Sequence, residues 1–236
     1  MVDRIRTAEG DAWQVHGELR AGTRTLHGIR CMASGLAHAQ WNNGDVTAAD
    51  ADVEGARAFY AVLGVPWGVR VPAELPWPHG RFLFRKRLMG VLADEFRPAP
   101  GVPGLTIELT TDLETVVAVD AAAFESEPVT EWVRGHLGRP GVETALASLA
   151  GRPVATAYTV FSDGPAGPAI YLSGVAVLPE ARRRGVGAAI SGWLVARGFE
   201  RGAALAHLHP DDERAARVYS RLGFVEVPGF DVYIDL

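Results

Sequence analysis

The sequence Y-L-S-G-V-A-V-L-P-E-A-R-R-R-G-V-G-A, residues 171–188, decides how the rest of the chain is interpreted. It predicts a buried strand that ends before Pro179, a loop with three arginines and two glycines, and then the start of a helix. Backbone N–H groups at the start of a helix have no intrahelical acceptors and lie at the positive end of the helix dipole. Gly185 and Gly187 have no Cβ, which leaves room for phosphate oxygens beside the backbone. The stretch therefore predicts a site for a diphosphate group.

Two known phosphate-binding loops do not match these residues. A Walker-type loop ends in Gly-Lys-Ser/Thr, whereas the only lysine of this chain is Lys86, far from the loop. A dinucleotide-binding fingerprint needs a third glycine where this chain has Ile190, and an acidic residue after the next strand, where it has His209. Neither loop type is therefore favoured.

The remaining pattern is V-x-P-x-x-R-x-x-G-x-G, formed by Val177, Pro179, Arg182, Gly185 and Gly187. It resembles the acyl-coenzyme A loop of the GNAT acetyltransferase superfamily. A second motif of that family, A-x-x-x-Y-x-x-x-G-F, is matched downstream by Ala215, Tyr219, Gly223 and Phe224. The two motifs have the family's order and spacing, and the resemblance covers roughly the last 130 residues.

The resemblance implies an α/β fold with a mixed sheet, the acyl-CoA N-acyltransferase fold, in residues 105–236. Hydrophobic periodicity there predicts the order β-α-α-β-β-β-α-β-α-β-β, which is the order of a complete GNAT domain. The last two strands of this prediction are Phe224–Val227 and Asp231–Leu236.

A segment rich in proline and glycine separates the two halves of the chain. Residues 98–104 cannot sustain a helix or an inner strand and predict a linker between residues 1–97 and 105–236. In the first half, residues 1–30 predict short strands or irregular structure, Asn42–Asp45 a turn, and the following residues a helix that Thr47 or Asp50 caps and Gly64 ends. Strands are expected at 66–71 and 81–92. The first half is either a smaller, degenerate GNAT-like domain or an unrelated α/β domain.

Composition limits the class of protein. The chain has 236 residues, 48% of them hydrophobic, and lacks an apolar run of the roughly 18 residues that a membrane span needs. A cytoplasmic monomer or homodimer is expected, and the single Cys31 predicts neither an internal disulfide nor a metal site. Residues 101–236 carry 11 basic and 17 acidic side chains, which disfavours nucleic acid as a partner and favours a cationic acceptor such as an amine.

The resemblance also implies where coenzyme A binds. The pantetheine arm is expected to lie along the end of the predicted strand before Pro179, and the diphosphate on the loop that follows this strand. The side chains of the strand also pack in the core. The expected contacts are Val175, Ala176 and Val177 with the arm, Arg182, Arg183, Arg184, Gly185, Val186, Gly187 and Ala188 with the diphosphate, and Asp212 and Ala215 with the arm from the next helix.

Tyr219 matches the tyrosine that protonates the leaving thiolate in the family. A phenol with an ordinary pKa of about 10 is protonated at neutral pH and can donate a proton to a less basic thiolate. The alternative is a core tyrosine on a helix that also carries Ala215, Val218 and Leu222.

No general base is evident, so a water-mediated base or an amine that arrives neutral is expected. Glu125 and Glu127 lie in a loop that shapes the acceptor pocket in relatives, although a solvated loop is the alternative for both. Tyr171, Ser173 and His207 are further candidates for acceptor contacts. His207 and His209 without a third ligand do not predict a metal.

The sequence thus predicts an acetyl-CoA-dependent N-acetyltransferase that acts on a primary amine of a small-molecule or aminoacyl acceptor, by direct attack in a ternary complex. Two alternatives stay open: a non-catalytic acyl-CoA sensor or interaction module, and a protein acetyltransferase that acts on lysine or an N-terminus.

Overall fold

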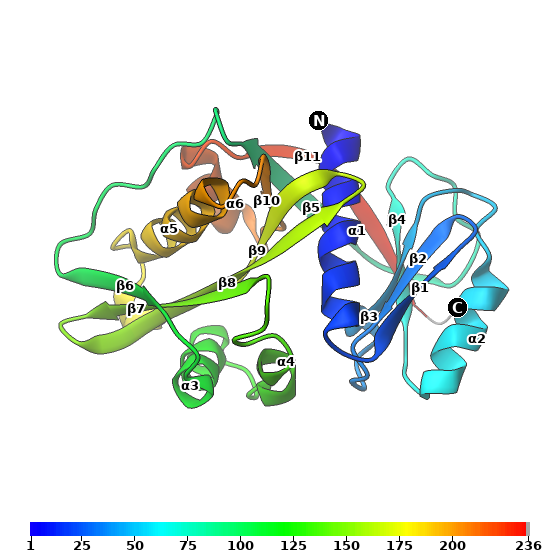
Figure 1. Ribbon diagram of the computed structural model, residues 1–236, viewed down its shortest axis with the longest axis horizontal. Coiled ribbons are helices and arrows are strands. Elements are labelled where there is room, and N and C mark those ends of the chain that lie inside the picture. Colours follow the sequence, from blue (N-terminus) through cyan, green and yellow to red (C-terminus); the bar gives the residue numbers. More distant parts are fainter. Residues whose placement is uncertain (235–236) are drawn as a thin grey trace.

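The computed structural model describes residues 1–234, in which eleven strands form one continuous mixed sheet (Figure 1). The strand order is β1-β2-β3-β4-β11-β5-β10-β9-β8-β7-β6. The first half of the chain contributes α1 (Val2–Glu18), β1 (Gly22–Leu26), β2 (Ile29–Ala33), η1 (Ala39–Trp41), β3 (Asn42–Val46), α2 (Val53–Leu63), β4 (Gly68–Pro72) and β5 (Arg81–Leu92). The second half contributes β6 (Leu105–Leu109), α3 (Leu113–Phe124), α4 (Thr130–Arg134), β7 (Val142–Leu149), β8 (Arg152–Gly164), β9 (Gly167–Val177), η2 (Pro179–Ala181), α5 (Val186–Glu200), β10 (Leu205–Leu208), α6 (Glu213–Arg221) and β11 (Val225–Ile234).

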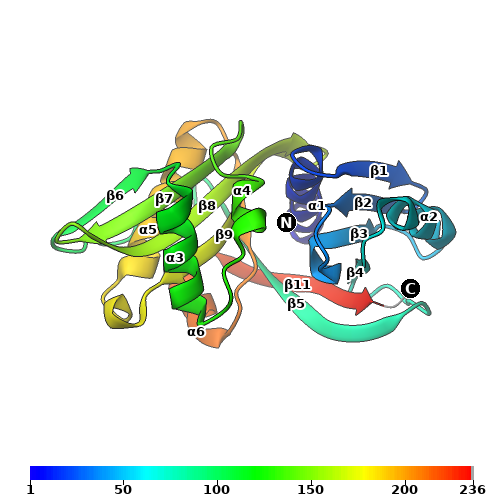
Figure 2. The ribbon, with the colours of Figure 1, turned by 90° about the horizontal axis from the view of Figure 1, so that it is seen from below.

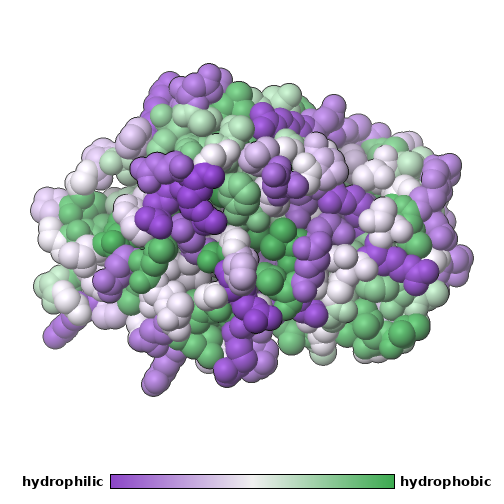
Figure 3. Space-filling model, in the orientation of Figure 1, coloured by the Kyte–Doolittle hydropathy of each residue, from purple (hydrophilic) through white to green (hydrophobic). Residues whose placement is uncertain are grey.

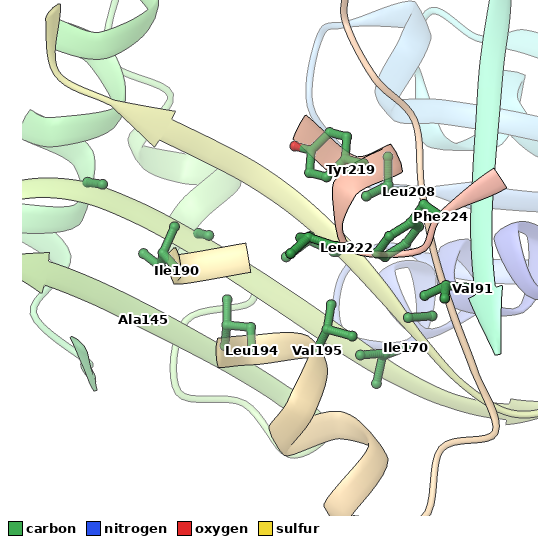
Figure 4. Packing of buried hydrophobic residues seen from close by; sticks show 14 of the residues in the cluster. Val91, Ala145, Ile170, Ile190, Leu194, Val195, Leu208, Tyr219, Leu222 and Phe224 are labelled. Carbon is green, nitrogen blue, oxygen red and sulfur yellow. The ribbon is translucent and has the colours of Figure 1, made fainter. Parts of the chain in front are cut away.

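The strands of the second half lie between two helical layers. Figures 1 and 2 show α5 on one face of β7–β9 and α3 on the other. On the α5 face, Ile190 and Leu194 are fully buried in the main core and pack with Ile170 of β9 and Leu222 after α6 (Figure 4). The predicted mixed α/β fold is therefore confirmed.

The two halves of the chain share the sheet through an exchange of strands. β5 of the first half lies between β10 and β11 of the second half, and β11 in turn lies between β5 and β4 (Figure 2). Residues 98–104 contain no helix or strand, as expected for a linker. The division into residues 1–97 and 105–236 nevertheless stays a prediction, because the sheet is continuous across both.

The prediction of short strands in residues 1–30 is wrong for its first part, which forms the long helix α1. Its buried face includes Glu9, Asp11 and His16 beside Ile5 and Trp13, so the apolar residues do not show a helical period. Glu9 and Asp11 have polar partners in distant elements: Glu9 accepts a hydrogen bond from Arg70, and Asp11 accepts one from the Ala166 backbone N–H at 3.0 Å. Figure 1 shows α1 at the junction of the two halves.

Asn42–Asp45, expected as a turn, is part of the fully buried strand β3. The Asn42 side chain accepts a hydrogen bond from the Ser34 backbone N–H at 2.9 Å and donates to the carbonyls of Leu36 and Pro66. Asp45 is paired with Arg70 of β4. Turn-forming residues occupy a buried strand here because tertiary contacts satisfy their side chains.

The last two predicted strands form one strand instead of a pair. β11 runs from Val225 to Ile234 with a bulge between Val227 and Phe230, where Pro228 and Gly229 interrupt the register with β5. Residues 235–236 of the predicted strand lie outside the described residues. β5 occupies the sheet position between β10 and β11.

Aspartate side chains cap α2, α3 and α6. Asp112 and Asp212 cap α3 and α6 by accepting from backbone N–H groups three residues on. α2 is capped by Asp52 instead of the expected Thr47 or Asp50, and it ends at Gly64 as predicted.

Candidate active site

A cavity of about 440 Å³ lies between the end of β9, the start of α5 and α6, and we call it the β9–α5 cavity. Its lining includes every residue predicted to contact coenzyme A except Arg184. β9 pairs with β10 only from Ala169 to Tyr171 and separates from it beyond that point. Val175–Val177 therefore present backbone groups toward the cavity, where an extended ligand can pair with them.

The loop before α5 is shaped to receive an anion. Gly185 caps the helix with a φ of 84°, and Arg183 also has a left-handed φ of 61°. Because α5 begins at Val186, the N–H groups of its first turn have no intrahelical acceptors. A Cβ on Gly187 would lie 3.5 Å from Val177 Cγ2, which is an ordinary contact. Glycine is therefore not needed here to avoid a clash within the protein, and its missing side chain leaves space in the cavity.

The three loop arginines have different positions. Arg182 donates to the carbonyls of Val177 at 3.1 Å and Ala123 at 2.6 Å, so its guanidinium joins the end of β9 to α3. Arg184 is exposed and does not line the cavity, whereas Arg183 does. Arg214 and Arg221 of α6 also line it and were not predicted. Both arginines lie on the helix that was predicted to carry Tyr219, and this shared helix is the feature of the sequence that could have indicated them.

Tyr219 lines the β9–α5 cavity from α6 and is only 8% exposed. Its ring packs 5.9 Å from that of Phe224 (Figure 4). Burial raises the pKa of the Tyr219 phenol, and the nearby Asp211 carboxylate raises it further. The phenol is therefore protonated at neutral pH and borders the space where a ligand's reactive end would lie.

A second cavity, of about 360 Å³, lies between the two halves of the chain and is walled by aromatic rings; we call it the aromatic cavity. Trp13 comes from α1, Trp41 from η1 and Trp132 from α4. Trp132 stacks on Trp41 with ring centroids 5.0 Å apart and lies 5.9 Å from Trp13. Tyr158 and Tyr171, from β8 and β9, complete the wall. No local pattern in the sequence links the three tryptophans.

A buried ionic cluster forms the floor of the aromatic cavity. Glu9 Oε1 accepts hydrogen bonds from Lys86 Nζ at 2.8 Å, Arg70 Nη1 at 3.0 Å and Trp13 Nε1 at 3.0 Å. Arg70 also binds both oxygens of Asp45, at 2.6 and 2.7 Å. Burial alone would raise the pKa of Glu9, but Lys86, with further help from Arg70, holds it well below its usual range. Glu9 is therefore ionised.

Asp211 lines both cavities and marks their junction. It follows β10 and precedes the Asp212 cap of α6. Burial raises the pKa of Asp211, and the neighbouring Asp212 carboxylate raises it further. His209 lines the aromatic cavity beside Asp211, and burial lowers its pKa to about 3, so the imidazole is neutral. Neither residue was predicted as a site residue.

The predicted acceptor contacts are divided among different locations. Tyr171 and Ser173 line the aromatic cavity. His207 is fully buried behind it, with Nδ1 3.3 Å from Glu9 Oε2. Glu125 and Glu127 are exposed in the loop between α3 and α4, and neither lines the two cavities. Their role in acceptor binding stays a prediction.

Within residues 1–234, no group of three or more histidine, cysteine or acidic side chains is arranged to hold a metal ion. No helix in this part of the chain is long and apolar enough to cross a membrane.

Figure 3 shows hydrophilic residues dispersed over one face of the molecule.

Comparison with known proteins agrees with this geometry. The profile of the acetyltransferase (GNAT) family matches residues 108–224. A GCN5-related N-acetyltransferase from Kribbella flavida aligns over 99% of this chain and 94% of its own, with 21% identity and a TM-score of 0.71. A putative GNAT-family acetyltransferase from Novosphingobium aromaticivorans aligns over 97% of this chain and 96% of its own, with 22% identity and a TM-score of 0.63. At these identities the likeness concerns the fold, and no curated protein matches the sequence.

The chain belongs to the GNAT acetyltransferase family. It is an acetyl-CoA-dependent acyltransferase, and the solved structures that resemble it cover both halves of the chain.

Proposed function

We propose that this protein transfers an acetyl group from acetyl-CoA to a primary amine of a small-molecule or aminoacyl acceptor, by direct attack in a ternary complex. The observation that carries the proposal is the junction of the two cavities at Asp211. Residues of β9 line both: Tyr171 and Ser173 the aromatic cavity, and Val175–Val177 the β9–α5 cavity. A thioester in the second cavity and an amine in the first would meet at this strand.

The β9–α5 cavity offers a contact for each part of acetyl-CoA. The first turn of α5, with Arg183, Arg214 and Arg221, holds the diphosphate. Val175–Val177 pair with the amide groups of the pantetheine arm and so direct the thioester toward Tyr171. The open backbone of β9 and the glycine at position 187 support this placement.

Asp211 and Tyr219 divide the proton transfers. As the amine nitrogen bonds to the carbonyl carbon and the C–S bond breaks, Asp211 accepts the proton that the amine loses. Tyr219 donates its phenolic proton to the departing sulfur. The raised pKa of the Asp211 carboxyl makes it a stronger base than an ordinary aspartate, and the raised pKa of Tyr219 keeps the phenol protonated until transfer.

The test is release of free thiol from acetyl-CoA in the presence of a panel of amines that includes amino acids, aromatic amines, spermidine and a peptide with a free N-terminus. Thiol release that depends on one class of small amine, with the acetylated amine found by mass spectrometry, is expected. Tight binding of acetyl-CoA without turnover of any amine would instead assign the sensor function. Turnover of the peptide alone would assign a protein acetyltransferase.

A further inference from the structure

The aromatic cavity contains two buried cations, which is unusual for the binding site of a cationic amine. Lys86 is 8% exposed and Arg70 is 2% exposed, and both line the cavity. Lys86 is the only lysine among the 23 basic residues of the sequence; all the others are arginines. The cations that line the cavity are Arg70, Arg85, Lys86 and Arg87, against the single lining carboxylate of Asp211. Arg85 binds Asp231 and Arg87 binds Glu226, two carboxylates outside the lining.

The hydrogen bonds of the two buried cations are incomplete within residues 1–234. An ammonium has three donors, and the hydrogen bond to Glu9 uses one of those of Lys86. A guanidinium has five, and Arg70 uses three, two to Asp45 and one to Glu9. Glu9 Oε1 already accepts three hydrogen bonds, so this oxygen has no further capacity. Glu9 Oε2 has only His207 Nδ1 nearby, at 3.3 Å, and accepts no hydrogen bond from Lys86 or Arg70. Both cations therefore keep unused donors beside the cavity.

The electrostatics of the floor agree with this count of donors. Burial lowers the pKa of the Lys86 ammonium in spite of the attraction of Glu9, so the pair does not fully compensate the desolvation of the charge. A ligand carboxylate in the cavity would accept the unused hydrogen bonds and offset this cost.

The aromatic walls argue against a second cation at the same place. A bound cation is attracted to the face of an indole, but the Trp13 face is already used by Arg70, 4.6 Å from the ring centroid, and by Lys86, 5.3 Å from it. A ligand cation here would be repelled by both. The stacked rings of Trp41 and Trp132 offer apolar surface to the body of a ligand.

We propose that the acceptor is a small aminocarboxylate with an apolar or aromatic body, whose carboxylate binds Lys86 and Arg70 while its amine faces Asp211. This rests on the proposed acetyltransferase function and names its substrate class. The carboxylate occupies the cationic floor, the body lies against Trp41 and Trp132, and the amine points to the junction with the β9–α5 cavity. Amines without an anionic group would leave the buried donors unpaired, which is why they bind less well.

Matched pairs of amines that differ only in the carboxylate test the proposal: L-tryptophan with tryptamine, L-phenylalanine with phenethylamine, and L-leucine with isopentylamine. In the full-length protein, kcat/KM is expected to be at least tenfold higher for the carboxylated member of a pair. Preferred turnover of the amines without a carboxylate, spermidine included, would overturn the inference and leave the acetyltransferase function standing.

Lys86 also permits a binding test that does not depend on turnover. Because the chain has one lysine, protein labelled with [13C]lysine gives a single set of side-chain NMR signals. Addition of L-tryptophan without acetyl-CoA is expected to shift the Lys86 ε-CH2 signal, and tryptamine at the same concentration is expected to leave it in place. Absence of a shift with all three amino acids would refute the inference. A shift without thiol release from any amine would refute acetyl transfer but retain the site.

Lys86→Met removes the ammonium and keeps an unbranched apolar stem. The preference of the variant for L-tryptophan over tryptamine is expected to fall to within about threefold of unity, through a higher KM for L-tryptophan. Arg152→Gln, a charge removal in the exposed β7–β8 hairpin, is the control and should retain the preference of the natural protein. A Lys86→Met protein that folds, by circular dichroism, and keeps the full preference would contradict the inference; if it does not fold, the NMR titration of the natural protein decides.

Discussion

Replacement of Tyr219 by phenylalanine removes only the phenolic oxygen that is proposed to protonate the leaving thiolate. The ring is 8% exposed and keeps its packing against Phe224, so no cavity larger than a hydroxyl forms. At most one hydrogen bond is lost, and the Ser191 hydroxyl is the group that opposes the rise in the pKa of Tyr219. The free energy of unfolding should therefore fall by about 1 kcal/mol, and Tm by roughly 2–4 °C.

The effect on the reaction should be much larger than the effect on stability. A general acid contributes roughly 10²–10⁴-fold, and a phenol with a raised pKa is a weak acid toward a thiolate, so the lower end is expected. We predict that kcat falls by roughly 10², about 2.7 kcal/mol, while the Kd for coenzyme A changes less than about threefold.

The assay combines stopped-flow thiol release under saturating acetyl-CoA with calorimetric binding of coenzyme A and thermal unfolding. Ser191→Ala is the matched control: it removes the neighbouring hydroxyl and should keep the turnover of the natural protein. A Tyr219→Phe protein with normal kcat and a lower Tm would show that the hydroxyl is structural. That result would refute the proton-donor role and leave the fold and the coenzyme site unaffected.

Three further predictions concern the coenzyme loop, the proposed base and the buried histidines. Gly187→Trp should fill the space beside the first turn of α5 and raise the Kd for coenzyme A at least tenfold, about 1.4 kcal/mol, with the circular dichroism spectrum unchanged. An unaltered Kd by calorimetry would contradict binding of the diphosphate at this loop. Asp211→Asn should lower kcat/KM for the amine at least tenfold and flatten the acidic limb of its pH profile, whereas a parallel profile would exclude Asp211 as the base. Burial lowers the pKa of His136 and of His209 to about 3. Between pH 6.5 and 3 the unfolded chain therefore binds protons that the folded protein does not. As the pH falls through this range, each histidine should lower the free energy of unfolding by roughly 1.4 kcal/mol per pH unit. In urea unfolding at several pH values, His136→Asn should show a shallower loss than the natural chain, and equal slopes would contradict the lowered pKa of His136.

The sequence by itself determined the features that depend on residues close together in the chain. The proline, arginine and glycine spacing between Val177 and Gly187 defines a strand, a turn and a helix start, because proline, glycine and unsatisfied N–H groups act within a few residues. Capping by Asp112 and Asp212 and the helix that carries Tyr219 were predictable for the same reason. The β9–α5 cavity is built from these local elements, and every residue predicted to contact coenzyme A except Arg184 therefore lines it.

Only the tertiary structure decided the features that depend on distant partners. Residues 2–18 form a helix and residues 42–46 a buried strand because the polar groups of Glu9, Asn42 and Asp45 are satisfied by elements far along the chain, which offsets the local preference for other conformations. The insertion of β5 between β10 and β11 brings Lys86 beside Asp211, whose pKa it lowers against the larger effect of burial. The aromatic cavity joins α1, η1 and α4, elements that no local period or motif connects, so the cavity could not be predicted from residue spacing.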